Sequence, residues 1–264
     1  MEIIEQFRRG KISDEKCEDT LVTTTDFLGI VDGVTAKSPF RYQGKTTGKW
    51  ASTLIAQTIA EADPATTLPD LLRQINGVIQ RFYEQVPFPY DRVSQGLQAV
   101  AVVYSRQLRQ LWLVGDCQLL VDGQAVTNPK KSDVVLGNFR SLVLATTPAT
   151  TNDDPGRDAI LPWILKATQF ANDASTDWGY AIINGQPIPS ELCRVIQLDQ
   201  QPHQIVMASD GYPVLKGSLA ETEAALQRVL ATDPQCTHGY VSTKGLKVGN
   251  RSFDDRSYLR FNIK

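Results

Sequence analysis

Residues 26–37 read DFLGIVDGVTAK, an apolar run that ends on an acidic residue. The run holds four apolar, strand-forming side chains: Phe27, Leu28, Ile30 and Val31. These residues predict a buried strand that stops at Asp32, directly before a glycine. A carboxylate at the end of a buried strand costs free energy unless a partner offsets its desolvation. The role of Asp32 can therefore be inferred from the other acidic residues of the chain that could share a bound cation with it.

Three further acidic sites lie beside strand-like runs: Asp210 at the end of QIVMASDG, Asp254–Asp255 before SYLRFNI, and Glu18–Asp19 before LVTTTDFLGIVD. Glycine follows Asp210 as it follows Asp32, and we expect it to let the backbone turn sharply and leave the carboxylate accessible. Each Asp-Gly pair alone is more typical of a simple turn at a strand end than of a metal site. Together, carboxylates gathered at one edge of a sheet predict a site for two divalent cations about 3.5–4 Å apart.

Composition narrows the class of protein. The chain has 264 residues, 42% of them hydrophobic and 21% charged, with a formal net charge of −2. It therefore has enough apolar residues for a sizeable core, and nothing indicates a basic surface for nucleic acid. Its apolar runs fall short of the roughly 20 residues of a membrane span. The first residues, MEIIEQFRRGK, carry their basic charges after the short apolar part and do not resemble a signal peptide.

Cysteine and histidine usage points to hard metal ions. The four cysteines, Cys17, Cys117, Cys193 and Cys236, form no CxxC pair, and only His203 and His238 are present. We therefore expect no zinc site and no disulfide framework, and we expect a reducing, cytoplasmic setting. Any metal would rest on carboxylates, which favour magnesium or manganese.

Periodic apolar residues predict helices over residues 49–62, 66–86, 158–171 and 218–231. Thr67 with Asp70, and Ser218 with Glu221, have capping-box spacing. The helix over 158–171 requires Pro162 to lie in its first turn.

Short β-branched runs predict strands over residues 98–105, 109–116, 193–198, 204–209 and 257–263. Hairpins are expected over 117–127, turning at Asp122-Gly123, and over 179–188, turning at Asn184-Gly185. Helices and strands come in separate runs rather than in strict alternation, which favours antiparallel sheets covered by helices, an α+β fold in one domain over residues 1–264.

In motif order, the chain resembles the metal-dependent serine/threonine protein phosphatases, the type 2C phosphatases, over nearly its whole length. The matching motifs are Glu18-Asp19, Phe27 to Gly33, Val114 to Gln118, Ala208 to Gly211 and Asp254-Asp255. The resemblance implies a four-layer α-β-β-α sandwich of two antiparallel sheets. It also implies a hydrolase of phosphoserine or phosphothreonine that uses two divalent cations, Mn²⁺ or Mg²⁺.

The resemblance further implies roles by position. Asp32 would bridge both metals, Asp210 and Asp254 would complete one, and Asp19 with the backbone carbonyl of Gly33 would complete the other. Glu18 would act through metal-bound water. A bridging water of lowered pKa would give the hydroxide that attacks the phosphomonoester. Asp32, Asp210 and Glu18 are thus the expected catalytic residues.

Several family features are missing. Val34 stands where many members have a histidine, although many bacterial relatives also lack it. The phosphate-gripping arginine would fall at Asp14, so Arg8, Arg9, Lys11 or Lys16 would have to replace it, unless they form a solvated basic run. Asp116 is kept for a possible third metal, but its acidic partner is replaced by Val214.

Two functional classes stay open at this point. One is a phosphatase acting on a phosphoprotein or a small phosphomonoester. The other is a catalytically weak relative that binds a partner or ligand as a regulatory module. Residues 128–190 match the family least, and we expect them to carry substrate or partner recognition.

Overall fold

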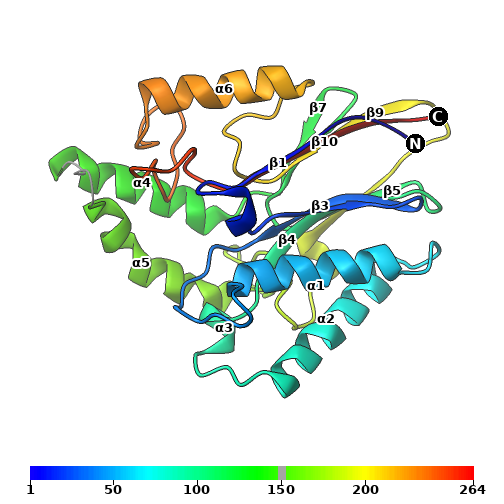
Figure 1. Cartoon of the computed structure of the whole chain (residues 1–264), viewed down its shortest axis with the longest axis horizontal. Helices are drawn as coiled ribbons and strands as arrows, with labels where there is room; N and C mark the ends of the chain where they lie inside the picture. The colour runs from blue at the N-terminus through cyan, green and yellow to red at the C-terminus, as the bar shows by residue number, and fades with distance from the viewer. Residues whose placement is uncertain (148–152) are drawn as a thin grey trace.

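The computed structural model describes residues 1–147 and 153–264 as two antiparallel sheets packed face to face, with helices on both outer faces (Figure 1). Each sheet has five strands. The predicted α+β class and the four-layer α-β-β-α arrangement are confirmed.

The first sheet has the order β1-β10-β9-β6-β7. Its strands are β1 (Glu2–Arg9), β10 (Arg256–Ile263), β9 (His203–Ala208), β6 (Gln118–Val121) and β7 (Gln124–Val126). The second sheet has the order β2-β3-β4-β5-β8. Its strands are β2 (Thr20–Thr23), β3 (Phe27–Gly33), β4 (Ala99–Ser105), β5 (Gln110–Val114) and β8 (Cys193–Gln197). All neighbouring strands of both sheets are antiparallel.

Alternation along the central strands builds two cores. In β3, Leu28 and Ile30 pack between the sheets against Met207 and Leu259. The intervening Phe27 and Val31 join the core under the outer helices. Because both faces of β3 are covered, the strand reads as a nearly continuous apolar run.

Helices α1 (Thr47–Glu61) and α2 (Leu68–Gln85) cover the second sheet, and α6 (Leu219–Thr232) covers the first (Figure 1). The predicted caps are present: the Thr67 hydroxyl accepts a hydrogen bond from the Asp70 amide, and Ser218 accepts one from Glu221. Helix α6 is also tied to its sheet through Glu223, which pairs with the buried Arg256 of β10 at 2.7 Å.

Helices α4 (Lys131–Thr146) and α5 (Pro155–Ala167) pack together at one end of the sandwich (Figure 1). The sequence patterns did not predict α4. For α5, the expected start was wrong: the helix begins at Pro155, capped by Asp154, so Pro162 lies inside it rather than in its first turn. The short helix α3 (Arg92–Gln95) and three 3₁₀ turns, Asp14–Lys16, Thr168–Phe170 and Ser190–Leu192, complete the described elements.

One predicted hairpin is present and the other is not. Asp122 and Gly123 have φ values of 51° and 81° and join β6 to β7 as a two-residue turn. The expected hairpin at Asn184-Gly185 was wrong, because Ile183 instead pairs with Ala99 at the start of β4.

Within the described ranges, no helix has both the length and the apolar character that a membrane crossing requires.

Candidate metal and phosphate site

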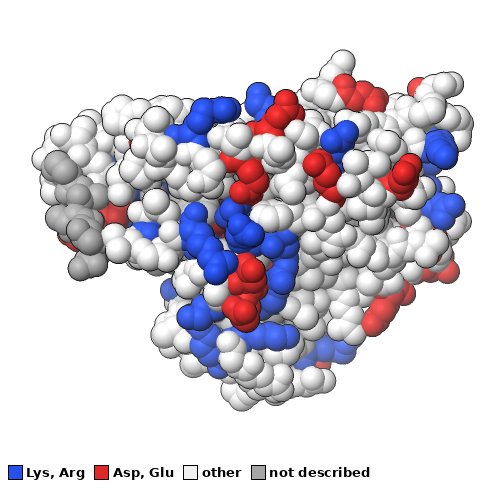
Figure 2. All heavy atoms as spheres, turned by 45° about the horizontal axis from the view of Figure 1, so that its top comes forward, with Lys and Arg blue, Asp and Glu red and all other residues white. Residues whose placement is uncertain are grey.

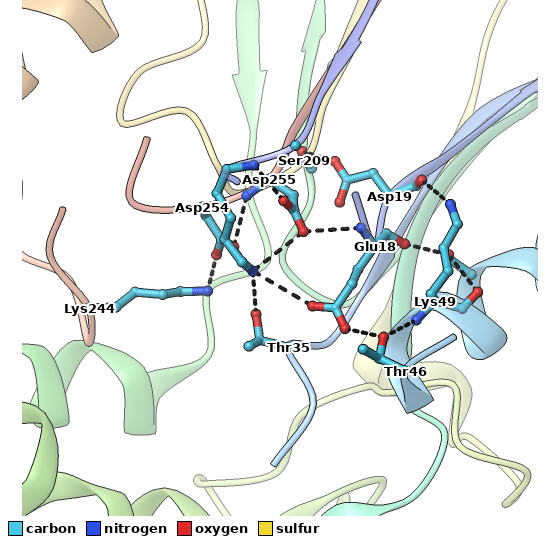
Figure 3. Close-up of polar contacts among 12 residues, drawn as sticks. Glu18, Asp19, Thr35, Thr46, Lys49, Ser209, Lys244, Asp254 and Asp255 are labelled. Carbon is cyan, nitrogen blue, oxygen red and sulfur yellow. Dashed lines mark hydrogen bonds and ion pairs between the residues drawn. The ribbon is translucent and has the colours of Figure 1, made fainter. Parts of the chain in front are cut away.

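Carboxylates from both sheets converge on one side of the sandwich. Asp32 is the last residue but one of β3, Asp210 follows β9, Asp254 precedes β10, and Asp116 follows β5. All four line a cavity of about 180 Å³. Figure 3 shows that Glu18 and Asp19, which precede β2, lie beside Asp254 and Asp255. The structure therefore brings together the acidic residues that the strand-end motifs singled out.

Glycine is required after Asp32 and Asp210 because a side chain would collide with neighbouring backbone, and not because the chain makes a sharp turn there. Neither Gly33 nor Gly211 has a positive φ. A Cβ atom on Gly33 would lie 2.3 Å from the Gly48 carbonyl oxygen of α1, and one on Gly211 would lie 1.8 Å from the Asp255 carbonyl oxygen. The expected role of these glycines is corrected accordingly: they let neighbouring backbone approach the strand end that carries the carboxylate.

Asp19 is fully buried and only half satisfied. Its Oδ2 accepts hydrogen bonds from the hydroxyls of Ser209 and Ser257, both at 2.8 Å. Its Oδ1 has no partner among the described residues. Burial raises the pKa of Asp19 to about 6, although the two hydroxyls oppose the rise. A buried carboxylate oxygen without a hydrogen-bond partner is available to bind a cation, so Asp19 Oδ1 is a candidate metal ligand.

Asp32, Asp116 and Asp210 form no ion pair and accept no side-chain hydrogen bond within the described part of the chain. Burial, followed by the charges of Asp19 and Asp210, raises the pKa of Asp32 well above its usual value. Burial and Asp210 raise the pKa of Asp116 to about 7. These carboxylates therefore repel one another in a poorly solvated place, and a cation would relieve that repulsion.

Lys11 neutralises the other half of the cluster. Its Nζ lies 3.0 Å from Asp254, 3.4 Å from Asp255 and 3.6 Å from Glu18. It also donates to the Thr35 hydroxyl at 2.9 Å. Burial alone would lower the pKa of Lys11, but Asp255, Glu18 and Asp32 together raise it. Lys11 is thus a fixed internal cation at this side of the site.

Lys244 is a second cation at Asp254. Its Nζ contacts Asp254 Oδ2, so both oxygens of this carboxylate face a lysine (Figure 3). Burial and the neighbouring Lys11 lower the pKa of Lys244. Sequence reasoning missed Lys244, because residues 233–255 contain no helix or strand and give no periodic signal that places a side chain.

Glu18 is held in place by several contacts. Its side chain accepts a hydrogen bond from the Thr46 hydroxyl and faces Lys11, while its amide donates to Asp255 at 3.1 Å. Thr46 also caps α1, so the same hydroxyl links Glu18 to the start of that helix.

All four basic residues that the sequence offered for phosphate binding, Arg8, Arg9, Lys11 and Lys16, lie outside the cavity lining. Arg8 donates to the Asp19 carbonyl at 3.4 Å, Arg9 stacks over Phe7 at 5.0 Å, and Lys16 is exposed. Their assignment to phosphate binding remains a prediction. Of the basic residues considered from the sequence, Lys11 is the one that contacts the carboxylate cluster.

Val214 lies outside the cavity, whereas Cys17 lies beside two of the acidic residues. The side chain of Val214 was expected beside the metal centre, but it is 45% exposed and outside the cavity lining. Cys17 lies with Asp19 and Asp255, all three offering ligand atoms within 4.8 Å of one another. Burial and Asp19 raise the pKa of the Cys17 thiol to about 12, which disfavours the thiolate in the absence of a bound cation.

The donors present are carboxylate and carbonyl oxygens, several of them without partners, and this set suits hard divalent cations. Asp254 is the exception, since two ammonium groups already face it.

Comparison with solved structures identifies the fold. The chain matches the catalytic domain of the serine/threonine phosphatase PstP in complex with two manganese ions, with a TM-score of 0.52, 15% identity, and coverage of 98% of this chain and 97% of that one. It matches PstP/Ppp of Mycobacterium tuberculosis with a TM-score of 0.50, 16% identity and 98% coverage of both chains. It matches Stp1 of Staphylococcus aureus with a TM-score of 0.50, 13% identity, and 98% and 94% coverage.

No protein-family model matches the sequence, and no curated protein does so. At such low identity the structural likeness establishes the fold, which is that of the metal-dependent Ser/Thr phosphatases. The resemblance read from the motifs is confirmed at that level.

Proposed function

We propose that this chain is a metal-dependent phosphomonoester hydrolase that removes phosphate from phosphoserine and phosphothreonine in proteins. One observation carries the proposal: Asp32, Asp116 and Asp210, from three separate strand ends, share a cavity and form no direct ion pair in the described structure. The fold in which they do so is one that PstP uses with two manganese ions.

Two divalent cations, Mn²⁺ or Mg²⁺, would be held by the predicted residues. The side chains of Asp19, Asp32, Asp210 and Asp254 and the Gly33 carbonyl would hold them. Bound there, the cations supply positive charge that activates water and neutralises phosphoryl oxygens. Lys244 would have to leave the Asp254 oxygen that it contacts.

The chain's own side chains would orient the reaction. Ser209 and Ser257 hold Asp19 with one oxygen free. Thr46 and Lys11 hold Glu18, which would accept a proton or a hydrogen bond at the edge of the site. Once displaced from Asp254, Lys244 would be free to pair with the substrate phosphate. With Val34 in place of the family's histidine, no imidazole supplies the leaving-group proton, and turnover should be slow.

The proposal also covers the domain, the cellular compartment and the partner. We treat residues 1–264 as one catalytic domain acting in the cytoplasm, with a phosphoprotein as partner. Neither nucleic acid nor a membrane has a part in it.

The test is phosphate release from phosphoserine, phosphothreonine and phosphotyrosine peptides with Mn²⁺ or Mg²⁺. We expect release from the first two, little from the third, and loss of most activity in Asp32→Asn. Glu61→Gln, an exposed acid at the far end of α1, is the matched control and should behave as wild type. Tight peptide binding without phosphate release would favour the regulatory-module alternative instead.

A further inference from the structure

The cavity that holds the carboxylates also has a basic side. Lys37 comes from the loop after β3, Lys130 stands directly before α4, and Arg157 lies in the first turns of α5. We propose that Lys37 and Arg157 form a second anion site, so that preferred substrates carry another negative group close to the phosphomonoester. This inference rests on the proposed function and names the substrate class that it serves.

The ion pairs of the basic side chains that line the cavity support this site. Lys130 is already neutralised: its Nζ lies 3.1 Å from Asp133 and 4.4 Å from the centre of the Tyr180 ring. Lys37 has only a long contact of 3.5 Å to the Gln98 amide oxygen, and Arg157 donates to the Thr243 carbonyl at 2.9 Å. Among described residues, neither has a carboxylate within 4.0 Å.

Lys37 and Arg157 therefore line the cavity without a direct ion pair among the described residues. Burial and the neighbouring Lys130 lower the pKa of Lys37 to about 8, and the more distant Asp133 only partly opposes this effect. Glu191 also lines the cavity, but it is exposed and accepts from Ser190 at 3.2 Å. Figure 2 shows Lys and Arg side chains gathered around acidic ones on one face of the molecule.

The basic side lies next to the acidic side. Arg157 is bonded to the Thr243 carbonyl, while the adjacent Lys244 contacts Asp254. Since consecutive Cα atoms are about 3.8 Å apart, the two halves of the cavity meet at this dipeptide. Both halves line one cavity of about 180 Å³.

The required chemistry is a phosphomonoester with a nearby carboxylate or second phosphate. Such a ligand occurs in two forms: a small molecule, or a peptide with an acidic residue next to the phosphorylated one. Both would place an anion between Lys37 and Arg157, where charge-assisted hydrogen bonds are strong.

The experiment compares matched substrates on the manganese-loaded full chain. In the small-molecule arm, 3-carboxyphenyl phosphate is compared with phenyl phosphate. In the peptide arm, phosphoserine followed by Asp is compared with phosphoserine followed by Asn. We expect kcat/KM to favour the doubly anionic member on the order of tenfold in at least one arm, and that arm identifies the source.

Single variants then show whether Lys37 and Arg157 cause the preference for the doubly anionic substrate. Lys37→Gln and Arg157→Gln should each bring the ratio close to one. Lys166→Gln, an exposed lysine of α5 outside the cavity lining, should keep the wild-type ratio. A wild-type ratio near one in both arms would overturn the anion site and leave the proposed function standing. A ratio that survives both variants would also overturn it.

If no ester is hydrolysed, the proposed function fails and the anion site is tested separately. Calorimetry would then compare binding of 3-carboxyphenyl phosphate with that of phenyl phosphate. Tighter binding of the former, lost in Lys37→Gln, supports the site, and equal binding overturns it.

Discussion

Lys11 controls the charge of the proposed metal centre, because its ammonium group faces Glu18, Asp254 and Asp255 at 3.6, 3.0 and 3.4 Å. Replacing it with methionine removes the only described cation that touches all three. Breaking such a buried arrangement typically costs about 3–5 kcal/mol, because the remaining charges are left unpaired. The metal-free Lys11→Met variant should therefore melt well below wild type.

The same variant should respond more strongly to metal. With one positive charge gone, Mn²⁺ meets a more negative site, and binding to the native state raises the melting temperature. The increase on adding Mn²⁺ should be larger in Lys11→Met than in wild type, as measured by differential scanning calorimetry. Lys16→Met, in an exposed lysine nearby, is the control. An unchanged metal-free melting temperature in Lys11→Met would contradict this account of the charge balance.

At the scale of elements, the end of β3 is held against the start of α1 at Gly33, the residue after Asp32, which lies close to the Gly48 and Glu18 carbonyls. Gly33→Ala would force a Cβ atom to 2.3 Å from the Gly48 carbonyl oxygen. The strand end and the helix would have to separate, which should cost about 1–3 kcal/mol and weaken Mn²⁺ binding.

Gly77 provides a matched control, because its replacement by alanine should change the free energy of unfolding in the opposite direction. In α2, a Cβ atom on Gly77 would come no closer than 3.5 Å, to the end of the Arg81 side chain. Gly77→Ala should therefore stabilise the protein by about 0.5–1 kcal/mol through helix propensity. Urea unfolding of both variants tests the pair, and equal effects in the two would show that the close approach at Gly33 is unimportant.

His203 joins the start of β9 to the β6–β7 turn. Its ring nitrogens lie 2.7 Å from Asp122 and 3.0 Å from Asp199. The hydrogen bond to Asp122, more than the modest opposing effect of burial, raises the pKa of His203 above its usual 6.5. Because the native pKa is raised, this contribution to stability is complete below pH 6.5 and is lost as pH rises through the native value.

The predicted effect is a pH-dependent difference between wild type and His203→Asn. Both carboxylates are largely exposed, so the difference in free energy of unfolding should be only about 0.5 kcal/mol at pH 5.5. It should shrink towards pH 8.5. Urea melts at the two pH values measure it, and a difference that grows with pH would reverse the assigned sign.

At the scale of the whole molecule, Arg140 ties α4 and α5 to the segment that carries Lys244. The Arg140 side chain is fully buried, lies 2.7 Å from Asp154, and donates to the Gln235 carbonyl at 2.6 Å. Asp154 also caps α5, and asparagine caps equally well. Asp154→Asn therefore removes charge while keeping the cap.

We expect Asp154→Asn to destabilise the protein by about 2 kcal/mol, because Arg140 stays buried without its counter-charge. Hydrogen exchange should quicken first in α4, α5 and residues 235–245, before the sheets are affected. Asp158→Asn, an exposed acid in the same helix, is the control. Uniform loss of protection over both sheets would show that α4 and α5 do not open as a separate unit.

The fold was predictable from sequence where local and global preferences agree. Buried strands such as β3 read as apolar runs, and acidic residues at their ends stand out against them. Helix α4 escaped notice because Val134, Val135 and Leu142 are more than half exposed, so its apolar residues form no single stripe. The Asn184-Gly185 hairpin was wrong because a distant strand, β4, offered Ile183 a partner.

The site was predictable only in its acidic half. Asp32 and Asp210 lie at strand ends that the sequence marks, whereas Lys37 and Lys244 come from segments without periodicity. Tertiary contacts, which no local pattern encodes, bring these lysines to the cavity.

The proposed function requires divalent cations at the Asp32 cluster for hydrolysis of any phosphomonoester. The most direct test is the rate of p-nitrophenyl phosphate hydrolysis against Mn²⁺ concentration, for wild type and Asp32→Asn side by side. We expect no turnover by wild type in EDTA, a saturable rise with Mn²⁺, and a rate at least about 100-fold lower in the folded variant, equivalent to about 2.7 kcal/mol. Turnover by wild type in EDTA, or wild-type rates from Asp32→Asn, would contradict it.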